Sequence, residues 1–403
     1  MASPEAPSYR ALLASPGLAP LLAATLLSRL ATRMFSLVIV LYMLARFGSP
    51  ALAGWATFLS IAPGLAISPL AATALDRLGL RRGIGLDLTL GAAIMAGVAL
   101  FDAYLPASTV LLLMAIYSLT SPLGTGGIRA ALPRLVPEPL WPRVNALDTA
   151  TYGVVDVVGP AIGGIVIAAL GGRVAFGLIA ATYAASVLCL LAVGRVAAPT
   201  ATQRGLFADT LDGFLHFARH KTLRALALCY SLLNAGWGAL IILVPVVARE
   251  ALGDRGDTAA GVLWALAGAS GIVGALVSGR LAVAGNERRI LAWGMVIVAL
   301  ATFPLAAYGG LWGLAAAMVV MGLANGPIDV GLITLRQRRT NPAWFARVLV
   351  ISMSFNVVGM PLGAAFAGQL VHVALPLAFA AAALVTLAAA ASVALVPSEA
   401  EAA

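Results

Sequence analysis

The chain has few charged residues and almost no lysine or histidine. Charged residues make up 10% of its 403 residues, and hydrophobic residues make up 61%. A soluble domain is about a quarter charged. Because so little charge cannot cover a surface facing water, the composition excludes a water-soluble globular enzyme. It suits a chain surrounded by lipid, with room for roughly a dozen spanning helices of about 20 residues.

Cysteine and metal-ligand patterns are also scarce. The two cysteines, Cys189 and Cys229, lie inside apolar runs, and no CxxC pairs are present. His216 and His220 form an HxxxH pair without the glutamate of the HExxH zinc motif. We therefore predict no metal and no cofactor. The GxxxxGK[ST] phosphate-binding loop is missing too, so any driving energy must come from an ion gradient.

Continuous apolar runs predict membrane-spanning helices, because backbone polar groups in lipid must bond within their own segment. The runs do not alternate as the strands of a membrane barrel do. The predicted spans are 18–45, 51–71, 84–101, 107–128, 145–170, 174–194, 224–248, 258–280, 289–308, 311–334, 347–370 and 374–396.

The formal charge of +9 is a topology signal rather than a sign of nucleic-acid binding. Most arginines fall in the connections on one side of the predicted spans. The opposite side has Arg46, Arg173, Arg249 and Arg255. The positive-inside rule places the arginine-rich side, with both termini, in the cytoplasm. We expect a multi-pass protein of the bacterial inner membrane with no nucleic-acid partner.

The two halves of the chain resemble each other. PRLVPEPLWPRVNAL before span five matches RQRRTNPAWFARVLVI before span eleven, and a proline–glycine cluster follows each. Parallel repeats of this kind are typical of two-bundle transporters. We predict an all-α membrane protein with twelve transmembrane helices in two six-helix bundles, at 1–195 and 223–403. The linker 196–222 includes an amphipathic segment expected at the membrane surface.

These segments together resemble the major facilitator superfamily, within it the macrolide-efflux and enterobactin-exporter-like branch. The resemblance rests on LLSRLATRM, ALPRLVPEPLWPRVNAL, GPAIGG, DGFLHFARHKTLRAL and the Gln337–Arg347 loop. It implies a monomer in the lipid bilayer. It further implies secondary active export of a small-molecule, amphipathic substrate in exchange for protons, through a site between the bundles.

Two segments resemble gate motifs of that superfamily. ATALDRLGLRR after span two resembles GxLADRxGRR, and span five resembles the exporter-associated GPxxGG. The matching positions are Asp76, Arg77, Gly79, Arg81, Gly159, Pro160, Gly163 and Gly164. The resemblance implies a cytoplasmic gate at the first motif, where a generic basic loop is the alternative. Span five is expected to pack closely on span eight through Ser270, Gly274 and Ser278.

Charged residues at membrane depth are rare and mark function by default. Arg29 and Arg33 share one face of span one, Asp156 lies within span five, and Asp329 lies within span ten. Two interpretations stay open: a structural Arg–Asp pair, or proton coupling through Asp156 tuned by the two arginines. Asp87, near the cytoplasmic end of span three, is expected to form a structural pair with a nearby arginine.

Polar and aromatic residues at helical spacing are candidates for the cavity wall. They are Tyr117, Tyr152, Asn234, Trp237, Asn325 and Asn356. Such a mixed wall suits an amphipathic ligand. The alternatives to a proton-coupled exporter are an uptake symporter for a small anionic metabolite, with Arg29 and Arg33 as an anion clamp, and a non-transporting membrane protein.

Overall fold

The computed structural model describes most of the chain. The described residues are 15–132, 135–137, 141–194, 214–215, 217–278, 286–305, 308–339 and 342–397. All regular secondary structure in this part of the chain is helical. The principal helices are α2 (Leu18–Phe47), α3 (Pro50–Leu59), α4 (Ala62–Leu78), α5 (Leu80–Phe101), α6 (Ala107–Ala131), α7 (Trp141–Leu191), α9 (Lys221–Leu252), α10 (Gly256–Ser278), α11 (Glu287–Leu300), α13 (Gly310–Arg339), α14 (Pro342–Leu370) and α15 (Leu375–Ser392).

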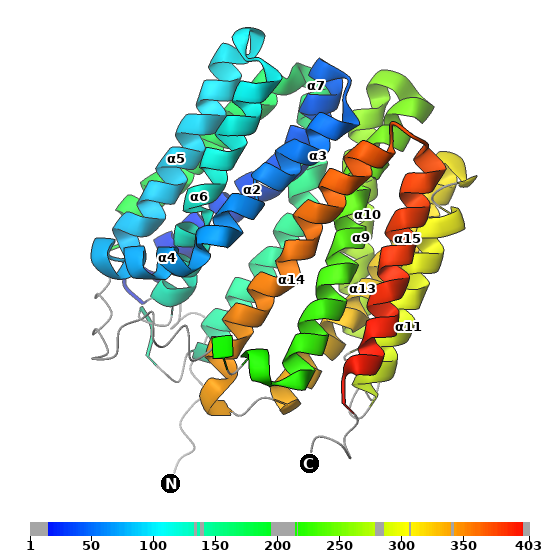
Figure 1. The fold of residues 1–403 in the computed structure, drawn as a ribbon. Helices are drawn as coiled ribbons and strands as arrows, with labels where there is room; N and C mark the ends of the chain where they lie inside the picture. The colour runs from blue at the N-terminus through cyan, green and yellow to red at the C-terminus, as the bar shows by residue number, and fades with distance from the viewer. Residues whose placement is uncertain are drawn as a thin grey trace.

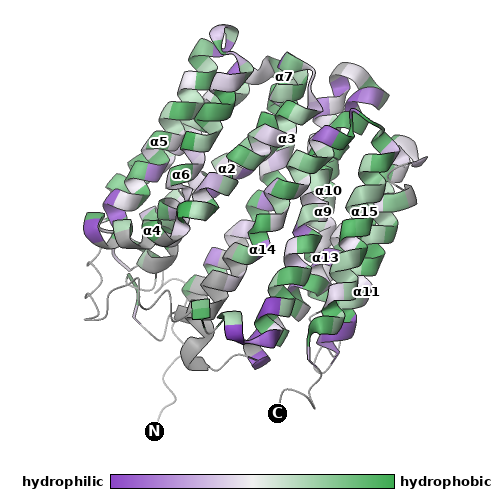
Figure 2. Ribbon diagram, in the orientation of Figure 1, coloured by the Kyte–Doolittle hydropathy of each residue, from purple (hydrophilic) through white to green (hydrophobic). Residues whose placement is uncertain are grey.

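The apolar runs form helices that lie roughly side by side (Figure 1). Within the described residues, nine helices are long and apolar enough to cross a membrane. Hydrophobic residues dominate the middle of these helices, and hydrophilic residues gather toward the ends (Figure 2). We call the end at which α2 begins and α15 ends the lower end, and the opposite one the upper end (Figure 1).

Helix α7 contains two of the predicted spans. A straight helix of its 51 residues would extend roughly 75 Å, far beyond the ~30 Å hydrocarbon core. Gly171 breaks it with a φ of 80° and a ψ of 172°, a conformation that favours glycine. The chain reverses direction at Gly171. Two contacts show this: Gly172 lies against the Tyr42 ring near the upper end, and the Leu191 carbonyl accepts a hydrogen bond from Arg81 at the lower end.

The second predicted span is divided into α3 and α4. Helix α3 ends at Leu59, and α4 begins at Ala62 with Pro63 in its first turn. Proline fits the first turn of a helix but cannot continue a preceding one, since it lacks the N–H donor. The span therefore bends where the sequence analysis treated it as one continuous helix.

Most helix contacts form within one half of the chain, and many join helices that are distant in sequence. In the first half α2 packs on α7 and α3, α5 packs on α6 and α7, and α4 packs on α6. In the second half α9 packs on α14 and α15, and α13 packs on α10 and α11. The main contacts between the halves are α7 with α10 and α3 with α14.

Small residues allow the second of these contacts. Gly54 of α3 lies against the backbone of Ala364 in α14, and Gly368 lies against Pro50. A side chain at either glycine would overlap the facing backbone, so α3 and α14 approach as closely as small residues permit.

Candidate functional site

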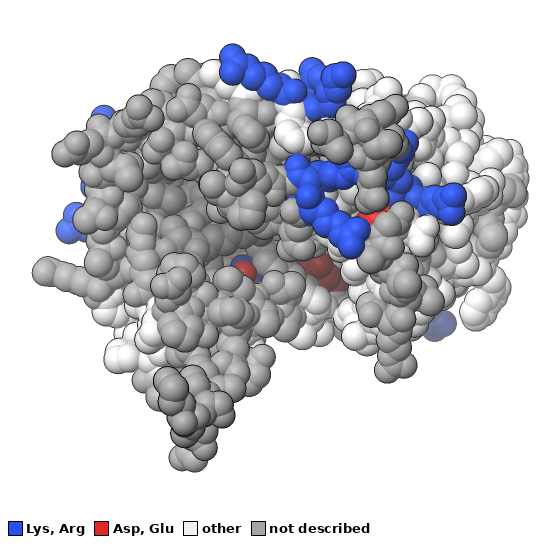
Figure 3. Space-filling view, turned by 90° about the horizontal axis from the view of Figure 1, so that it is seen from below, with Lys and Arg blue, Asp and Glu red and all other residues white. Residues whose placement is uncertain are grey.

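A cavity of about 910 Å³ lies between the two halves. Its walls come from α2, α3, α4, α6 and α7 on one side and from α9, α10, α13 and α14 on the other. From below, the molecule is hollowed between the halves, and charged atoms are visible deep inside (Figure 3). The charged side chains that line the cavity are Arg33, Asp156 and Asp329.

Arg33 and Asp156 form an ion pair in this wall. The Arg33 Nε lies 2.5 Å from an Asp156 carboxylate oxygen, and the two side chains are 39% and 43% exposed. Gly159 allows this contact, because a side chain there would overlap Arg33 and hold α7 away from α2. The pair is therefore open to whatever fills the cavity.

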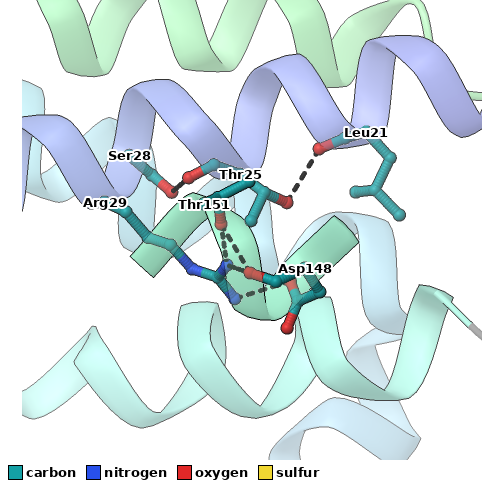
Figure 4. Close-up of polar contacts among 6 residues, drawn as sticks. All are labelled: Leu21, Thr25, Ser28, Arg29, Asp148 and Thr151. Carbon is teal, nitrogen blue, oxygen red and sulfur yellow. Dashed lines mark hydrogen bonds and ion pairs between the residues drawn. The ribbon is translucent and has the colours of Figure 1, made fainter. Parts of the chain in front are cut away.

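Arg29, one turn before Arg33, is differently placed (Figure 4). One of its terminal nitrogens lies 2.7 Å from an Asp148 carboxylate oxygen. The other donates to the Asp148 backbone carbonyl at 2.8 Å and to the Thr151 hydroxyl. The guanidinium also lies 3.7 Å from the centre of the Tyr152 ring. Arg29 does not line the cavity; it joins α2 to the first turns of α7.

Asp329 is held by neutral donors. The Tyr230 hydroxyl donates to one carboxylate oxygen, and the Asn325 amide donates to the other at 2.9 Å. Among the described residues, no ion pair includes Asp329. The described charged groups of the cavity wall are therefore one base and two acids.

Of the remaining residues predicted for the cavity wall, all but Asn356 line the cavity. Tyr117, Tyr152, Asn234, Trp237 and Asn325 line the cavity. Asn356 does not line it; its backbone carbonyl accepts a 3.0 Å hydrogen bond from the Asn234 amide.

Aromatic residues outside the predicted set also line the cavity, among them Trp264 and Phe35. Trp264 lies 5.9 Å from Trp237, centre to centre, and Phe35 lies 4.8 Å from Tyr117. Each is a single aromatic residue in an apolar run, so no spacing in the sequence separates it from a lipid-facing residue.

The turn after span two forms as its motif predicts. Gly79 ends α4 and precedes α5 with a φ of 80° and a ψ of 150°. Arg77 is exposed, and Arg81 donates a 2.9 Å hydrogen bond to the Leu191 carbonyl at the end of α7. The side chain of Asp76 lies outside the described residues, so its pairing with the opposite half stays a prediction.

The GPxxGG segment contacts two helices. Gly163 faces Met34 of α2, whereas Gly164 and Pro160 face Gly261 of α10. Gly268, seven residues after Gly261, also faces α7 through Val157.

The expected close contact of spans five and eight is present, but the expected α10 residues are wrong. Ser270 and Gly274 lie against Gly322 and Leu323 of α13. At about 100° per residue, position 270 is half a turn away from Gly261. It therefore belongs to the opposite face of α10.

Charged residues join helices at the upper end. Arg249 of α9 contacts Asp257 through Nε at 2.5 Å and a terminal nitrogen at 2.8 Å. It also donates to the Leu41 carbonyl of α2 at 2.7 Å. From the sequence, Arg249 is expected only in a connection on the side opposite the cytoplasm.

Part of the linker packs on the second half. Phe217 stacks on Phe355 of α14, with ring centres 5.1 Å apart. His216 and residues 196–213 lie outside the described residues, so the surface helix predicted there stays a prediction. In the described part of the chain, no three His, Cys, Asp or Glu residues form a group that could hold a metal.

A multi-helix membrane fold with a charged cavity between two halves is the architecture of a membrane transporter. The Major Facilitator Superfamily profile matches residues 21–287, and the chain belongs to this family. A solved structure of the nucleoside transporter NupG superposes with a TM-score of 0.75 at 16% identity, over 94% of this chain and 98% of that one.

Sequence relatives confirm the predicted branch. The chain is 44% identical to the uncharacterized MFS-type transporter y4rN of Sinorhizobium fredii, over 98% of each chain. It is 27% identical to the multidrug efflux pump Tap of Mycobacterium tuberculosis, over 82% of this chain and 81% of Tap. It is 28% identical to the enterobactin exporter EntS of Shigella boydii, over 64% of this chain and 62% of EntS.

Proposed function

We propose that this protein exports small amphipathic molecules across the bacterial inner membrane in exchange for protons. The main support for this proposal is the half-exposed Arg33–Asp156 ion pair in the wall of the central cavity. A ligand or a proton can open a pair in this position, whereas the Arg29–Asp148 pair is screened by the surrounding helices. Proton and substrate would then compete through Asp156, which is the linkage that an antiporter needs.

We infer twelve spans in two six-helix bundles, at 1–195 and 223–403, joined by the linker 196–222. The nine candidate spans support this number once α7 is counted as two crossings. Helices α11 and α14 supply the other two. The concentration of contacts within each half supports two bundles.

We assign the lower end to the cytoplasm. Lys and Arg side chains gather on the face seen in Figure 3, and cytoplasmic connections of membrane proteins are rich in these residues. Both termini would then be cytoplasmic. The upper end is held together by Arg249 and the α3–α14 contact, so the structure corresponds to a state open toward the cytoplasm.

Export rather than uptake is favoured by the relatives named as efflux pump and exporter and by the charge of the cavity. An anion clamp made of Arg29 and Arg33 would need both guanidinium groups in the cavity, but Arg29 is engaged by Asp148 and Thr151. The described wall has more acid than base. This arrangement disfavours a symporter for a small anion.

The proposal is tested with purified protein in proteoliposomes and ethidium as an amphipathic probe. A pH gradient should drive uphill ethidium movement by the wild type and by Asp102→Asn. Asp102 follows α5 at the upper end, where it pairs with Arg46 outside the cavity, so this variant is the control. Asp156→Asn should bind ethidium but lose gradient-driven movement. Uphill movement by Asp156→Asn at the wild-type rate would contradict the role of Asp156, and no movement by the wild type would contradict proton-coupled export of this probe.

A further inference from the structure

A second carboxylate lies in the interior of the first half. Asp87 belongs to α5, about two turns from the lower end of that helix. It packs against Gly124 of α6 so closely that a side chain at Gly124 would overlap the carboxylate. The absence of a side chain at Gly124 therefore creates the space that the acid occupies.

The expected pairing of Asp87 with an arginine is wrong for the described residues, since none of their ion pairs includes it. The nearest arginines in the sequence are engaged or turned outward. Arg81 donates to the Leu191 carbonyl, and Arg77 and Arg82 are exposed. A charged carboxylate at membrane depth costs about 2.5–3.5 kcal/mol, and taking up a proton removes that cost.

Hydrogen-bonded hydroxyl groups lead from this region to the cavity. The Tyr117 and Tyr183 hydroxyls are 2.7 Å apart, and the Tyr183 hydroxyl is 2.9 Å from the Thr32 hydroxyl. Asp87 is close enough to act electrostatically on both tyrosines. Tyr117 and Thr32 line the cavity, and Thr32 is adjacent to Arg33.

We propose that Asp87 is a second proton-binding group of this transporter, connected to the central cavity by Tyr117, Tyr183 and Thr32. The inference rests on the proposed proton coupling and extends it to a residue outside the cavity wall. A proton enters from water in the cavity, each hydroxyl accepts one proton and passes on its own, and the Asp87 carboxylate receives the last. Release follows the reverse route, so the hydroxyl groups are unchanged.

The groups facing Asp87 are few. Helix α6 contributes Tyr117 and the buried hydroxyl of Thr120. Helix α7 contributes Tyr183. Among the described residues, no titratable side chain of α4 interacts with Asp87. Titration of this carboxyl should therefore depend on its burial and on the Thr120 hydroxyl more than on neighbouring charge.

The test is infrared difference spectroscopy of the purified protein in lipid, titrated with acid and base without any substrate. The wild type should show the carbonyl band of a protonated carboxyl that disappears on deprotonation. Asp87→Asn should lose this band, while Asp156→Asn and the control Asp102→Asn should keep it. An unchanged titrating band in folded Asp87→Asn would overturn the proposal.

A second arm tests the connection without altering the acid. In D₂O, Tyr117→Phe should slow deuterium exchange of the carboxyl severalfold, because the hydroxyl that lines the cavity and bonds to Tyr183 is removed while the ring is kept. Tyr104→Phe, a change at a residue that is 84% exposed, should exchange at the wild-type rate. Equal exchange in Tyr117→Phe and the wild type would overturn the route. Both arms stand even if wild-type protein moves no ethidium, so failure of the transport proposal is seen separately.

Discussion

Arg249 and Asp257 form a two-point ion pair at the upper end, with nitrogen–oxygen distances of 2.5 and 2.8 Å. The same guanidinium donates to the Leu41 carbonyl. One arginine of the second half thus binds a backbone carbonyl of the first half. A substitution at position 41 would change the side chain but keep this carbonyl. Asp257 holds the arginine in position for that contact. The pair is well placed to keep the upper end closed.

Breaking this pair should favour opening of the upper end. In Asp257→Asn the fixed charge that orients Arg249 is lost, so the hydrogen bond to Leu41 weakens. Spin labels on the upper ends of α2 and α9 should show a larger share of long distances than in the wild type. Labels on the lower ends should show the opposite shift. Unchanged distance distributions at both ends would contradict a closing role for the pair.

The two α2–α7 ion pairs should differ in their contribution to stability. Asp148→Asn leaves the buried Arg29 without its partner, a kind of change that costs about 3–5 kcal/mol. Asp156→Asn breaks a half-exposed pair and should cost at most about 1 kcal/mol. Unfolding of both variants in mixed micelles measures the difference. Equal losses of unfolding free energy in the two variants would contradict a structural role for Arg29–Asp148 and an exchangeable role for Arg33–Asp156.

The α7–α10 contact should not tolerate an added methyl group. A Cβ at Gly164 would lie 2.8 Å from the Asp257 carbonyl oxygen and from the Gly261 Cα, so Gly164→Ala should cost about 1–3 kcal/mol through overpacking. Gly177→Ala changes the same helix at a position with open space around it and serves as the control. Thermal unfolding that is equal in the two variants would contradict this packing.

The excess acid in the cavity predicts a preference for cationic ligands. Asp329→Asn should raise the Kd for ethidium on the order of tenfold, or about 1.4 kcal/mol, because it removes a carboxylate that no described base neutralises. Tyr230→Phe removes one donor to that carboxylate and keeps its charge, so it should affect binding less. Fluorescence titration measures both values. A larger loss in Tyr230→Phe would contradict the electrostatic explanation.

The sequence predicts the helices of the described residues well, because a long apolar run in lipid is stable as a helix. The expected gap between 170 and 174 coincides with the reversal at Gly171. Pairing of charges depends instead on helix register. Arg29 and Arg33 share a face, yet one contacts Asp148 and the other Asp156. Nothing in the order of residues decides which arginine faces the cavity.

Contacts between distant segments were harder to predict. Arg249 reaches a carbonyl 208 positions earlier in the chain, and a backbone acceptor leaves no mark in the sequence. The small-residue spacing in α10 identified a packing face but not its partner. Both faces of α10 carry glycine, and Gly261 rather than Gly274 meets α7.

The most direct test of the central claim measures protons released when ligand binds. Purified protein in weakly buffered solution is mixed with ethidium, and a pH indicator reports the change. Below the pH at which the site is fully deprotonated, the wild type should release protons in proportion to bound ethidium, and Asp156→Asn should bind ethidium with clearly reduced release. Equal release by Asp156→Asn and the wild type would contradict competition between proton and substrate at Asp156.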